Sequence, residues 1–436
     1  MKILKSGQSK SFSDTNQSSV AETVKNALDN VRTSGDEAVR QLSNQFDNWS
    51  PADFRLSPEQ IQDCFDKIDP QTLADIKFAQ DNISRFATEQ LKTLQPLEVE
   101  SQPGVFLGHR HIPVSASGAY IPGGRYPMLA SAHMTILTAK VAGVKRVVAC
   151  TPPINGEIPV ATVVAASLAG ADEIYILGGV QAIAAMSIGT ETIAPVNMIA
   201  GPGNAFVAEA KRQMYGEIGI DLFAGPTEVL IVADSTADPL LIAVDLLSQA
   251  EHGPESPAIL VTTDESVANA VMKNIEQILP NMSTGEVAKK AWEDFGQIIL
   301  CESSEELWAI ADDLASEHVQ IFTAQPREAL EKMNNYGALF LGQNTCVAYG
   351  DKVIGTNHVL PTLGAARYSG GLWVGKFLKT CTYQEVRDPI ASGELGRVCG
   401  RASRAENFEG HGRSGDIRAA RALGDQFEWI EELADV

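Results

Sequence analysis

The sequence predicts an α/β protein with two Rossmann-like parallel sheets, a helical N-terminal region and a helical C-terminal tail. Short apolar runs that end near Gly, Pro or Asp alternate with segments whose apolar residues recur at helical spacing. This alternation occurs twice, within residues 118–225 and again within residues 229–342. Strand–helix–strand repeats build parallel sheets with right-handed crossovers, so each set predicts one sheet. A chain of 436 residues also has the length for two or more domains.

Polar and helical segments precede the first set. Residues 1–16 are polar and rich in serine, which predicts an arm. Residues 18–47 show the pattern of two amphipathic helices broken near Ser34–Gly35, and a second helical block covers residues 57–94. Residues 101–124 are expected to be extended.

The two alternating sets define the expected strands and the domain boundaries. The strands of the first set are residues 144–150, 173–179 and 197–203, and those of the second are 229–235, 258–264, 297–303, 319–324 and 338–342. We assign residues 1–16 to an arm, residues 17–119 plus 227–371 to a first α/β domain, residues 120–226 to a second α/β domain and residues 372–436 to the tail. The tail is too polar to fold alone, so we expect it to pack on another surface, such as a partner subunit.

Charge and composition exclude several classes of protein. The formal net charge is −21, and a surface of this sign repels nucleic-acid backbones and anionic membranes. Six cysteines are scattered without a CxxC pair, which is typical of a reducing compartment. The N-terminal sequence lacks the apolar core of a secretory signal, and no apolar run reaches the ~18 residues of a membrane span. We therefore expect a cytoplasmic enzyme without a nucleic-acid or membrane partner.

Gln249 and His252 give the first indication of a site. The apolar spacing before them predicts the last turns of a helix, which Gly253–Pro254 ends. Residues three apart share one helix face, so the amide and the imidazole can point at one ligand. Taken alone, His252 is also explained as a residue that satisfies a carbonyl of the last helical turn.

Further histidines and acids lie in glycine-flanked segments of the second half. They are Glu317–His318, Asp351, Asn357–His358 and Glu406 with His411. Glu317 and His318 are expected at the end of a helix, where the pair could take a hydroxyl proton and activate water, or could simply cap the helix. His358 is expected in a loop and His411 in a glycine-rich turn. Together with Gln249 and His252, such residues form a ligand set without thiolate, which suits zinc in an open site.

Glycine turns follow two strands of the first set. Gly178–Gly179 follows residues 173–177, and Gly201-Pro202-Gly203-Asn204 follows residues 197–200. Each turn is expected to open a helix at the carboxyl edge of the sheet, where ligands of parallel sheets bind and where free N–H groups favour phosphate. Neither turn is a GxGxxG motif in its usual frame, so tight turns without a ligand explain the pattern equally well.

Five motifs in one order show that the chain resembles the histidinol dehydrogenase family. They are GAYIPGG, GPGNAFVAEAKRQ, SQAEHGPE, ASEH and GTNHVLPT, and the resemblance covers nearly the whole chain. It implies an enzyme that contains zinc and uses two NAD to oxidise a primary alcohol through an aldehyde to a carboxylate. It also implies a homodimer with swapped C-terminal tails, and an NAD-binding role for residues 120–226.

The resemblance implies a role for individual residues. It assigns zinc to Gln249, His252, Asp351 and His411, and NAD to Tyr120, Gln181 and Asn204. It assigns the substrate to Thr227, His318, His358 and Glu406. His318 would take the alcohol proton, and Glu317 would activate the water that attacks the aldehyde. His411 and Glu406 would reach the site of the neighbouring subunit.

Two segments resemble the sulfopropanediol dehydrogenase branch of this family more closely. They are GGRYPMLASAHMTILTAK and residues 350–386, and Thr227 stands where histidinol enzymes commonly have serine. The expected substrate is therefore a small sulfonated diol that is oxidised to a sulfolactate-type acid, with L-histidinol as the alternative. We hypothesise that Arg125, His133 or Arg367 binds the anionic group. A zinc hydrolase that needs no NAD and a catalytically silent binding protein are the competing classes.

Overall fold

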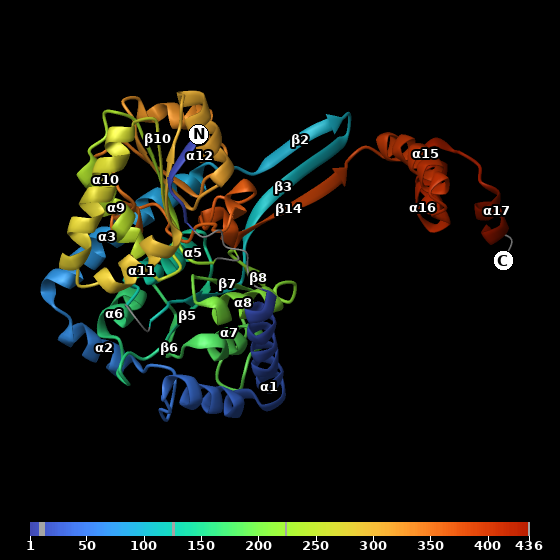
Figure 1. The fold of residues 1–436 in the computed structure, drawn as a ribbon. Helices are drawn as coiled ribbons and strands as arrows, with labels where there is room; N and C mark the ends of the chain where they lie inside the picture. Colours follow the sequence, from blue (N-terminus) through green and yellow to red (C-terminus); the bar gives the residue numbers. More distant parts are fainter. Residues whose placement is uncertain (8–13, 124–126, 223–224, 435–436) are drawn as a thin grey trace. The chain divides into compact units, whose positions relative to one another are not determined.

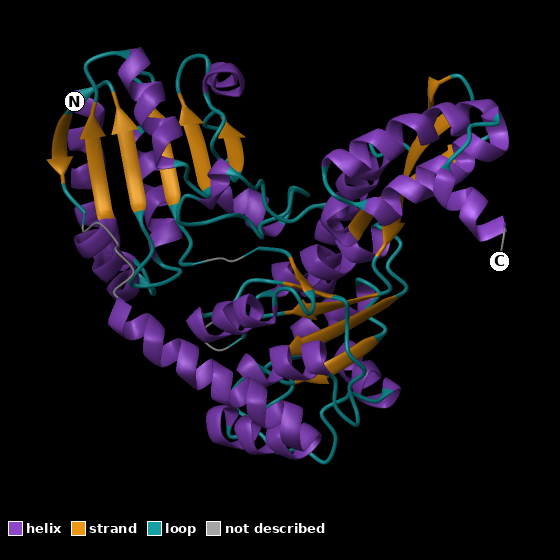
Figure 2. Cartoon of the chain, turned by 90° about the vertical axis from the view of Figure 1, so that its right-hand side faces the viewer, coloured by secondary structure: helices purple, strands orange, loops and turns teal. Residues whose placement is uncertain are grey.

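The computed structural model describes residues 1–7, 14–123, 127–222 and 225–434 (Figures 1 and 2). The chain divides into two compact units, Met1–Leu91 with Pro113–Phe377 and Lys92–Ile112 with Leu378–Val436. The predicted α/β class with parallel sheets and helical ends is confirmed. Among the described residues, no helix combines the length and the apolar character needed to cross a membrane.

The N-terminal segment contributes a strand and three helices to the first unit. β1 (Lys2–Lys5) pairs antiparallel with β11 (Gly296–Leu300), so these residues are an edge strand rather than part of an arm. The strand forms because Leu4 packs on the core of the sheet. α1 (Asp14–Asp47) is broken at Gly35, with φ of 51°, as predicted. α2 (Pro58–Lys67) and α3 (Pro70–Lys92) are the second helical block; residues 8–13 lie outside the described part of the chain.

A five-stranded parallel sheet in the order β6-β5-β4-β7-β8 contains the predicted first set. The strands are β4 (Ala116–Tyr120), β5 (Arg146–Thr151), β6 (Glu173–Ile176), β7 (Met198–Ala200) and β8 (Gly219–Ile220). The helices are α4 (Leu129–Ala132), α5 (Thr138–Val141), α6 (Val160–Leu168), α7 (Gly179–Ile188) and α8 (Ala205–Met214), and a π-helical turn, His133–Leu137, joins α4 to α5. Strand order reverses between β4 and β7, so the carboxyl ends of these two strands flank the crevice where such sheets bind ligands.

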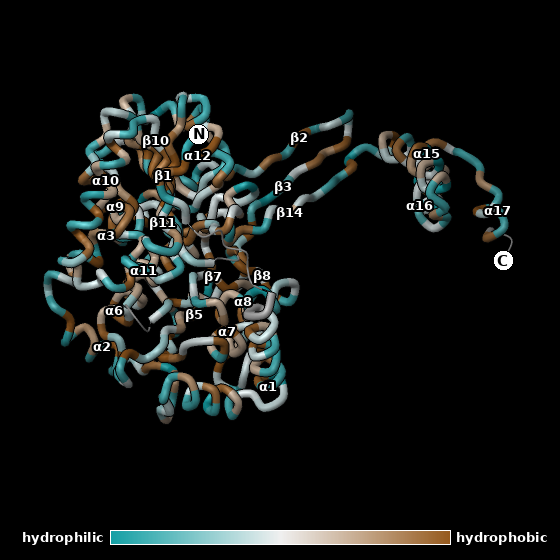
Figure 3. Tube along the Cα trace, in the orientation of Figure 1, coloured by the Kyte–Doolittle hydropathy of each residue, from teal (hydrophilic) through white to brown (hydrophobic). Residues whose placement is uncertain are grey.

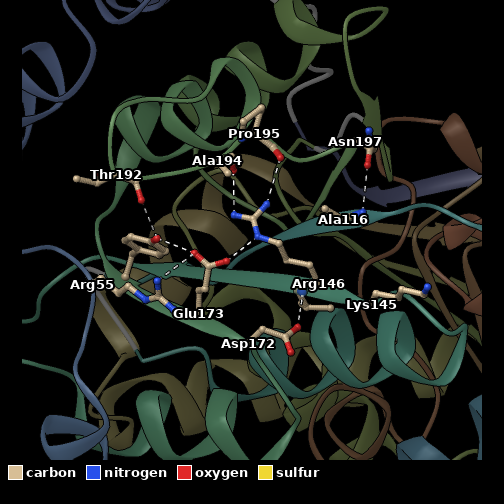
Figure 4. Close-up of polar contacts among 12 residues, drawn as sticks. Arg55, Ala116, Lys145, Arg146, Asp172, Glu173, Thr192, Ala194, Pro195 and Asn197 are labelled. Atoms are coloured by element: carbon tan, nitrogen blue, oxygen red, sulfur yellow. Dashed lines mark hydrogen bonds and ion pairs between the residues drawn. The ribbon is translucent and has the colours of Figure 1, made fainter.

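Ion pairs and hydrogen bonds close the opposite, amino edge of this sheet (Figure 4). The Arg146 guanidinium, at the start of β5, contacts the Glu173 carboxylate at 2.6 Å and donates to the carbonyls of Ala194 and Pro195. The Tyr175 hydroxyl donates to the same carboxylate at 2.7 Å. These bonds join strands β5 and β6 to the loop before β7, so this edge is structural.

A six-stranded sheet in the order β1-β11-β10-β9-β12-β13 contains the predicted second set. Its further strands are β9 (Val229–Ala233), β10 (Ala258–Thr262), β12 (His318–Phe322) and β13 (Ala338–Leu341), all parallel to β11. α9 (Pro239–Ala250), α10 (Glu265–Ile278), α11 (Gly285–Phe295), α12 (Ser304–Leu314), α13 (Ala329–Lys332) and α14 (Val347–Lys352) connect or follow the strands. Short 3₁₀ turns occupy Leu279–Asn281, Pro326–Glu328, Ala365–Arg367 and Val374–Phe377.

Both faces of this sheet are buried. Val229 and Ile231 of β9 pack in one hydrophobic cluster with α9, α10 and α11, whereas Leu230 and Val232 pack in another with α12. Such strands read as continuous apolar runs, which explains why the sequence located them accurately. The hydropathy colours of Figure 3 show the same apolar strands.

The second unit contains a three-stranded sheet and three helices. β2 (Leu97–Gln102) and β3 (Val105–Pro113) form an antiparallel hairpin, and β14 (Leu378–Val386) lies beside β3. α15 (Pro389–Ala405), α16 (Glu409–Leu423) and α17 (Glu428–Ala434) form the predicted helical tail, which the strand β14 precedes against expectation. The domain boundaries at residues 119/120 and 226/227 fall within the first unit and stay predictions.

Glycines allow the helices α15 and α16 to pack at very short range. A Cβ on Gly396 would overlap the carbonyl oxygen of Gly415, and one on Gly400 would lie 2.6 Å from the Asp416 carboxylate. Gly412 is also buried in α16. The glycine-rich run that predicted a turn around His411 is therefore the first part of a helix.

Candidate active site

Glu317 and His318 lie at the amino end of strand β12. Helix α12 ends at Leu314, because Ala315 adopts a left-handed conformation with φ of 49°. His318 is the first residue of β12, where it pairs with Val229 and Ala338 of the neighbouring strands. The prediction that Glu317 and His318 end a helix is therefore wrong, because the helix ends three residues before Glu317. Both side chains are almost completely buried.

The backbone around β9 fixes the tautomer of His318. Its Nδ1 lies 3.0 Å from the carbonyl oxygen of Glu228, and a carbonyl can only accept, so Nδ1 carries the hydrogen. Nε2 is buried without a hydrogen-bond partner and lies 3.6 Å from Asp351 Oδ1. Burial lowers the pKa of His318, but the Glu317 and Asp351 carboxylates outweigh it and raise this pKa well above its ordinary value. Because Nδ1 carries a hydrogen, Nε2 is the nitrogen that accepts a proton in the neutral ring, and the raised pKa makes it a stronger base.

A chain of hydrogen bonds holds one oxygen of Glu317. Its Oε2 accepts from the Thr227 hydroxyl at 2.6 Å and from the Glu228 N–H at 2.9 Å. The Gln249 amide nitrogen donates to the same hydroxyl at 2.5 Å. Because the hydrogen bonds that Glu317 accepts from the described residues all reach Oε2, Oε1 is the oxygen available to a substrate or a water.

Glu228 belongs to this group, although the sequence did not single it out. Its Oε1 accepts from the N–H of Glu317 at 3.3 Å and from that of Leu363 at 3.2 Å. Burial and the negative charge of Glu317 raise the pKa of Glu228 to about 7. Its position next to Thr227, directly before an apolar strand, was the available signal.

Asp351 and His252 complete the site on this unit. Asp351 lies in the short helix α14 rather than in a loop, and the buried Val347 anchors that helix. Burial raises the pKa of Asp351, but the interaction with His318 outweighs it and holds this pKa well below its usual range. Burial lowers the pKa of His252, which directly follows the C-cap of α9. The structure thus favours a carboxylate and a neutral imidazole, the forms that bind metal.

This donor set fits a zinc ion. Gln249 and Asp351 offer oxygens, His252 offers a neutral nitrogen, and the buried Nε2 of His318 faces Asp351 without a partner. No three His, Cys, Asp or Glu side chains in the described residues converge on one metal position. His252, Asp351 and the amide of Gln249 are therefore the candidate ligands that the described part of the first unit supplies.

His358 joins the site to the five-stranded half of the unit. The ring nitrogen Nε2 of His358 lies 3.1 Å from the Ser131 hydroxyl of α4, and the main-chain N–H of His358 donates to Met134 Sδ at 3.0 Å. Burial lowers the pKa of His358 to about 4. The charges of Asp351 and His252 also act on this ring, so His358 belongs to the same cluster.

The predicted cofactor residues lie at the carboxyl edge of the five-stranded sheet. Tyr120 ends β4, and its hydroxyl oxygen accepts from the Gly179 N–H at 3.1 Å, which leaves its own hydrogen to donate. The Gln181 amide nitrogen donates to Asp47 at 2.8 Å, whereas its oxygen is buried without a partner. Asn204 caps α8 by accepting from the N–H groups of Phe206 and Val207. The Gln181 oxygen, which has no partner among the described residues, and Tyr120 at the end of β4 beside the switch point fit a dinucleotide.

A buried ion pair shapes the loop that carries Asn204. The Lys211 ammonium contacts the Asp221 carboxylate and donates to the Gly201 carbonyl at 2.9 Å. Asp221 accepts from the Gly201 N–H at 2.7 Å. Gly201 has φ of 127°, and a Cβ there would overlap the carbonyl oxygen of Tyr120. The loop can therefore lie against β4 only with glycine at this position.

Glu406 and His411 lie in the second unit, at the connection between α15 and α16. Glu406 caps α15, and His411 occupies the first turn of α16, where its ring stacks edge-on against Phe408 with centroids 5.3 Å apart. Both side chains are exposed. Their exposure leaves both side chains accessible for the predicted roles, substrate binding by Glu406 and zinc binding by His411.

The three residues proposed for an anionic group have different surroundings. Arg125 lies outside the described residues. His133 is buried, its Nδ1 accepts from Gln80 at 3.0 Å, and burial lowers its pKa to about 4, so it brings no positive charge. Arg367 is half-exposed and pairs with Asp313 at 3.7 Å.

Comparisons with known proteins show the family of this chain. The family model described as histidinol dehydrogenase matches residues 10–419. The chain is 58% identical over 418 residues to a histidinol dehydrogenase homolog of Shouchella clausii, covering 96% of this chain and 98% of that protein. It is 44% identical over 421 residues to the sulfopropanediol 3-dehydrogenase of Ruegeria pomeroyi, covering 95% of each. The crystal structure of histidinol dehydrogenase from Elizabethkingia anophelis superposes with a TM-score of 0.89 at 32% identity, covering 96% of this chain and 95% of that one.

The neutral, buried His133 predicts a loss of stability in acid. The pKa of His133 falls from 6.5 to about 4 on folding, so its contribution is complete above pH 6.5 and is lost as the pH falls toward 4. Between pH 7.5 and 5 the loss amounts to about 2 kcal/mol. His133→Gln, which can still accept from Gln80, should lose about that much less of its unfolding free energy than the wild type.

Urea unfolding of both proteins at pH 7.5 and pH 5 measures this difference. His109→Gln, on strand β3, is the matched control and should follow the wild type. An equal acid loss in wild type and His133→Gln would contradict the prediction.

Proposed function

Because this chain belongs to the histidinol dehydrogenase family, we propose that it oxidises a primary alcohol through an aldehyde to a carboxylate. Zinc and NAD are typical of this family of oxidoreductases. The observation that carries the proposal is the Glu317–His318 pair, which keeps one carboxylate oxygen and one imidazole lone pair unengaged beside Asp351. Two oxidations need one group for the hydroxyl proton and another for the proton of water, and the pair supplies both.

In this proposal His318 acts first. Its Nδ1 is committed to the Glu228 carbonyl, so the buried Nε2 accepts the proton of the alcohol hydroxyl. Glu317 acts in the second oxidation, where Oε1 accepts a proton from the water that attacks the aldehyde carbon. Each oxidation sends one hydride to one NAD, and the water supplies the second carboxylate oxygen. Burial of the pair excludes other water.

Gln249, His252 and Asp351 would hold zinc, with His411 of the partner subunit as the fourth ligand. When bound, zinc polarises and orients the substrate oxygen beside the nicotinamide. The hydrogen bond from Gln249 to Thr227 keeps the amide oxygen turned toward the ligand position. Tyr120, Gln181 and Asn204 would hold NAD through the hydroxyl hydrogen, the orphaned amide oxygen and the N-terminus of α8.

We propose a homodimer with swapped tails. In the second unit, large apolar side chains such as Val398, Ile390 and Phe408 are more than half exposed, so this unit has surface to bury against a partner. Glu406 of the partner subunit would contact the substrate together with Thr227 and His358. A cytoplasmic location stays a prediction, which the six free cysteines support.

The substrate we propose is a small sulfonated diol. The 44% identity to a sulfopropanediol 3-dehydrogenase over 95% of the chain supports it. L-histidinol is the second candidate, since the structure that superposes with a TM-score of 0.89 is a histidinol dehydrogenase. Of the three candidates for binding the sulfonate, Arg367 is positively charged and half-exposed. His133 is disfavoured because it is buried, neutral and already hydrogen-bonded to Gln80.

One assay tests the proposed function against its alternatives. Purified protein is supplied with NAD and either 2,3-dihydroxypropanesulfonate, L-histidinol or an uncharged diol, with and without a chelator, and NADH absorbance is followed. We expect chelator-sensitive NADH formation, two NADH per alcohol, and the highest kcat/KM for the sulfonated diol. A higher value for L-histidinol selects the second candidate. Ester or amide hydrolysis without NAD would indicate a zinc hydrolase instead.

Replacing Glu317 should separate the two oxidations. Glu317→Gln removes the proton acceptor for water but keeps the hydrogen-bond acceptor for Thr227. We expect aldehyde oxidation to fall by about 10²- to 10⁴-fold, and alcohol oxidation by much less. Single-turnover kinetics with the alcohol and with the aldehyde measure the two steps, and Glu209→Gln on α8 is the control. Equal losses in both steps would contradict the assigned role.

Replacing His411 should release the metal. We expect His411→Asn to weaken zinc binding by more than about 100-fold, because loss of an outer-shell partner alone costs about 10- to 100-fold. Zinc titration with a competing chelator measures the affinity, and His109→Asn in the same unit is the matched control. Unchanged affinity in His411→Asn would remove this residue from the ligand set.

A further inference from the structure

We propose that Glu228 is a positioning residue for Glu317: the two glutamates form a reciprocal clamp across the amino ends of β9 and β12 that leaves only Oε1 of Glu317 free to react. The inference rests on the proposed role of Glu317 and adds a residue to it. Glu228 is assigned no contact with substrate, zinc or NAD. Its action is on the geometry of its neighbour.

The clamp consists of two crossed hydrogen bonds. The main-chain N–H of Glu228 donates to Glu317 Oε2 at 2.9 Å, and the main-chain N–H of Glu317 donates to Glu228 Oε1 at 3.3 Å. Each carboxylate therefore fixes the backbone of the other residue. With the Thr227 hydroxyl also on Oε2, rotation of the Glu317 carboxylate would break two hydrogen bonds at once.

The same residue holds the surroundings of the pair. Its carbonyl oxygen accepts from His318 Nδ1 at 3.0 Å. Its side chain accepts from the N–H of Leu363 at 3.2 Å, which ties down the segment that follows His358. Glu228 thus joins three stretches of chain, before β9, before β12 and after His358. Burial and, after it, the charge of Glu317 raise the pKa of Glu228, so a carboxylate at this position is unfavourable and its hydrogen bonds have to hold it there.

Glu209 is a buried glutamate with a structural role, and its surroundings differ from those of Glu228. Glu209 on α8 is also buried, and it bonds Arg212 at 2.7 Å and Gln213 at 2.7 Å. Its partners are one cation and one amide on its own helix. Glu209 is therefore the matched control for removal of a buried glutamate.

The test is a double-mutant cycle between Glu228 and Glu317 in the loaded enzyme. Glu228→Leu removes the acceptor, and we expect aldehyde oxidation at saturating substrate to fall about 10- to 100-fold, since displacement of a reactive group by about 1 Å costs up to about 100-fold. KM for NAD should be unchanged. Glu228→Gln keeps an acceptor for both N–H groups and should stay within about threefold of wild type.

The decisive measurement is made in the Glu317→Gln background. There Glu228→Leu should cost less than about threefold in aldehyde oxidation, because its effect passes through the missing carboxylate. An equal cost in both backgrounds overturns the inference while the role of Glu317 stands. If Glu317→Gln alone leaves aldehyde oxidation intact, the role of Glu317 and the inference both fail. Glu209→Leu should change stability without changing kcat, and Glu228→Asp repeats the test if the leucine variant does not fold.

Discussion

The hydrogen bonds between the amino ends of β9 and β12 are the constraint on which the rest of the site depends. Parallel pairing aligns His318 with Val229, and this register places Thr227 and Glu228 beside Glu317. A shift of one residue would turn His318 toward the other face of the sheet and would leave its imidazole without the Glu228 carbonyl. The apolar core on both faces makes such a shift costly, so packing far from the chemistry sets the direction of one nitrogen lone pair.

The two sheets of the first unit present opposite edges to the proposed reaction. Of the predicted cofactor residues, Tyr120 ends β4, Gln181 follows β6 and Asn204 follows β7, so they lie at the carboxyl ends of parallel strands, as is usual. Glu317 directly precedes β12 and His318 begins it, so the proton-accepting pair lies at the amino end of this strand, where the rule does not look for a site. His358 and Ser131 join the two groups, and the π-helical turn His133–Leu137 begins two residues after Ser131. Such turns often accompany functional sites because they displace the helix register locally.

The sequence was informative wherever a pattern had one physical cause. Continuous apolar runs located β5, β6 and β7 of the first sheet and β9 to β13 of the second, whereas β4 and β8 were not predicted as strands. Gly35 broke α1 where its positive φ is needed. It was less informative where long-range contacts decide. Leu4 joins β1 to a sheet whose partner strand lies almost 300 residues away, and β14 depends on β3 in the same manner. Glu228 was not recognised as part of the site: its place next to Thr227 was a weak signal, because its contacts are made with residues 317 and 363.

The glycine seam between α15 and α16 has a consequence for how this protein can change over time. A glycine inside a helix costs about 1 kcal/mol relative to alanine, yet Gly396, Gly400, Gly412 and Gly415 accumulate where the two backbones nearly touch. A methyl group at Gly396 would push the helices apart and displace everything they carry. The solvent-facing sides of α15 and α16 can accept many side chains, whereas the positions where the two helices touch accept almost none other than glycine. Substitution is therefore constrained at these glycines and much less constrained at the charged residues on the outer faces of the two helices.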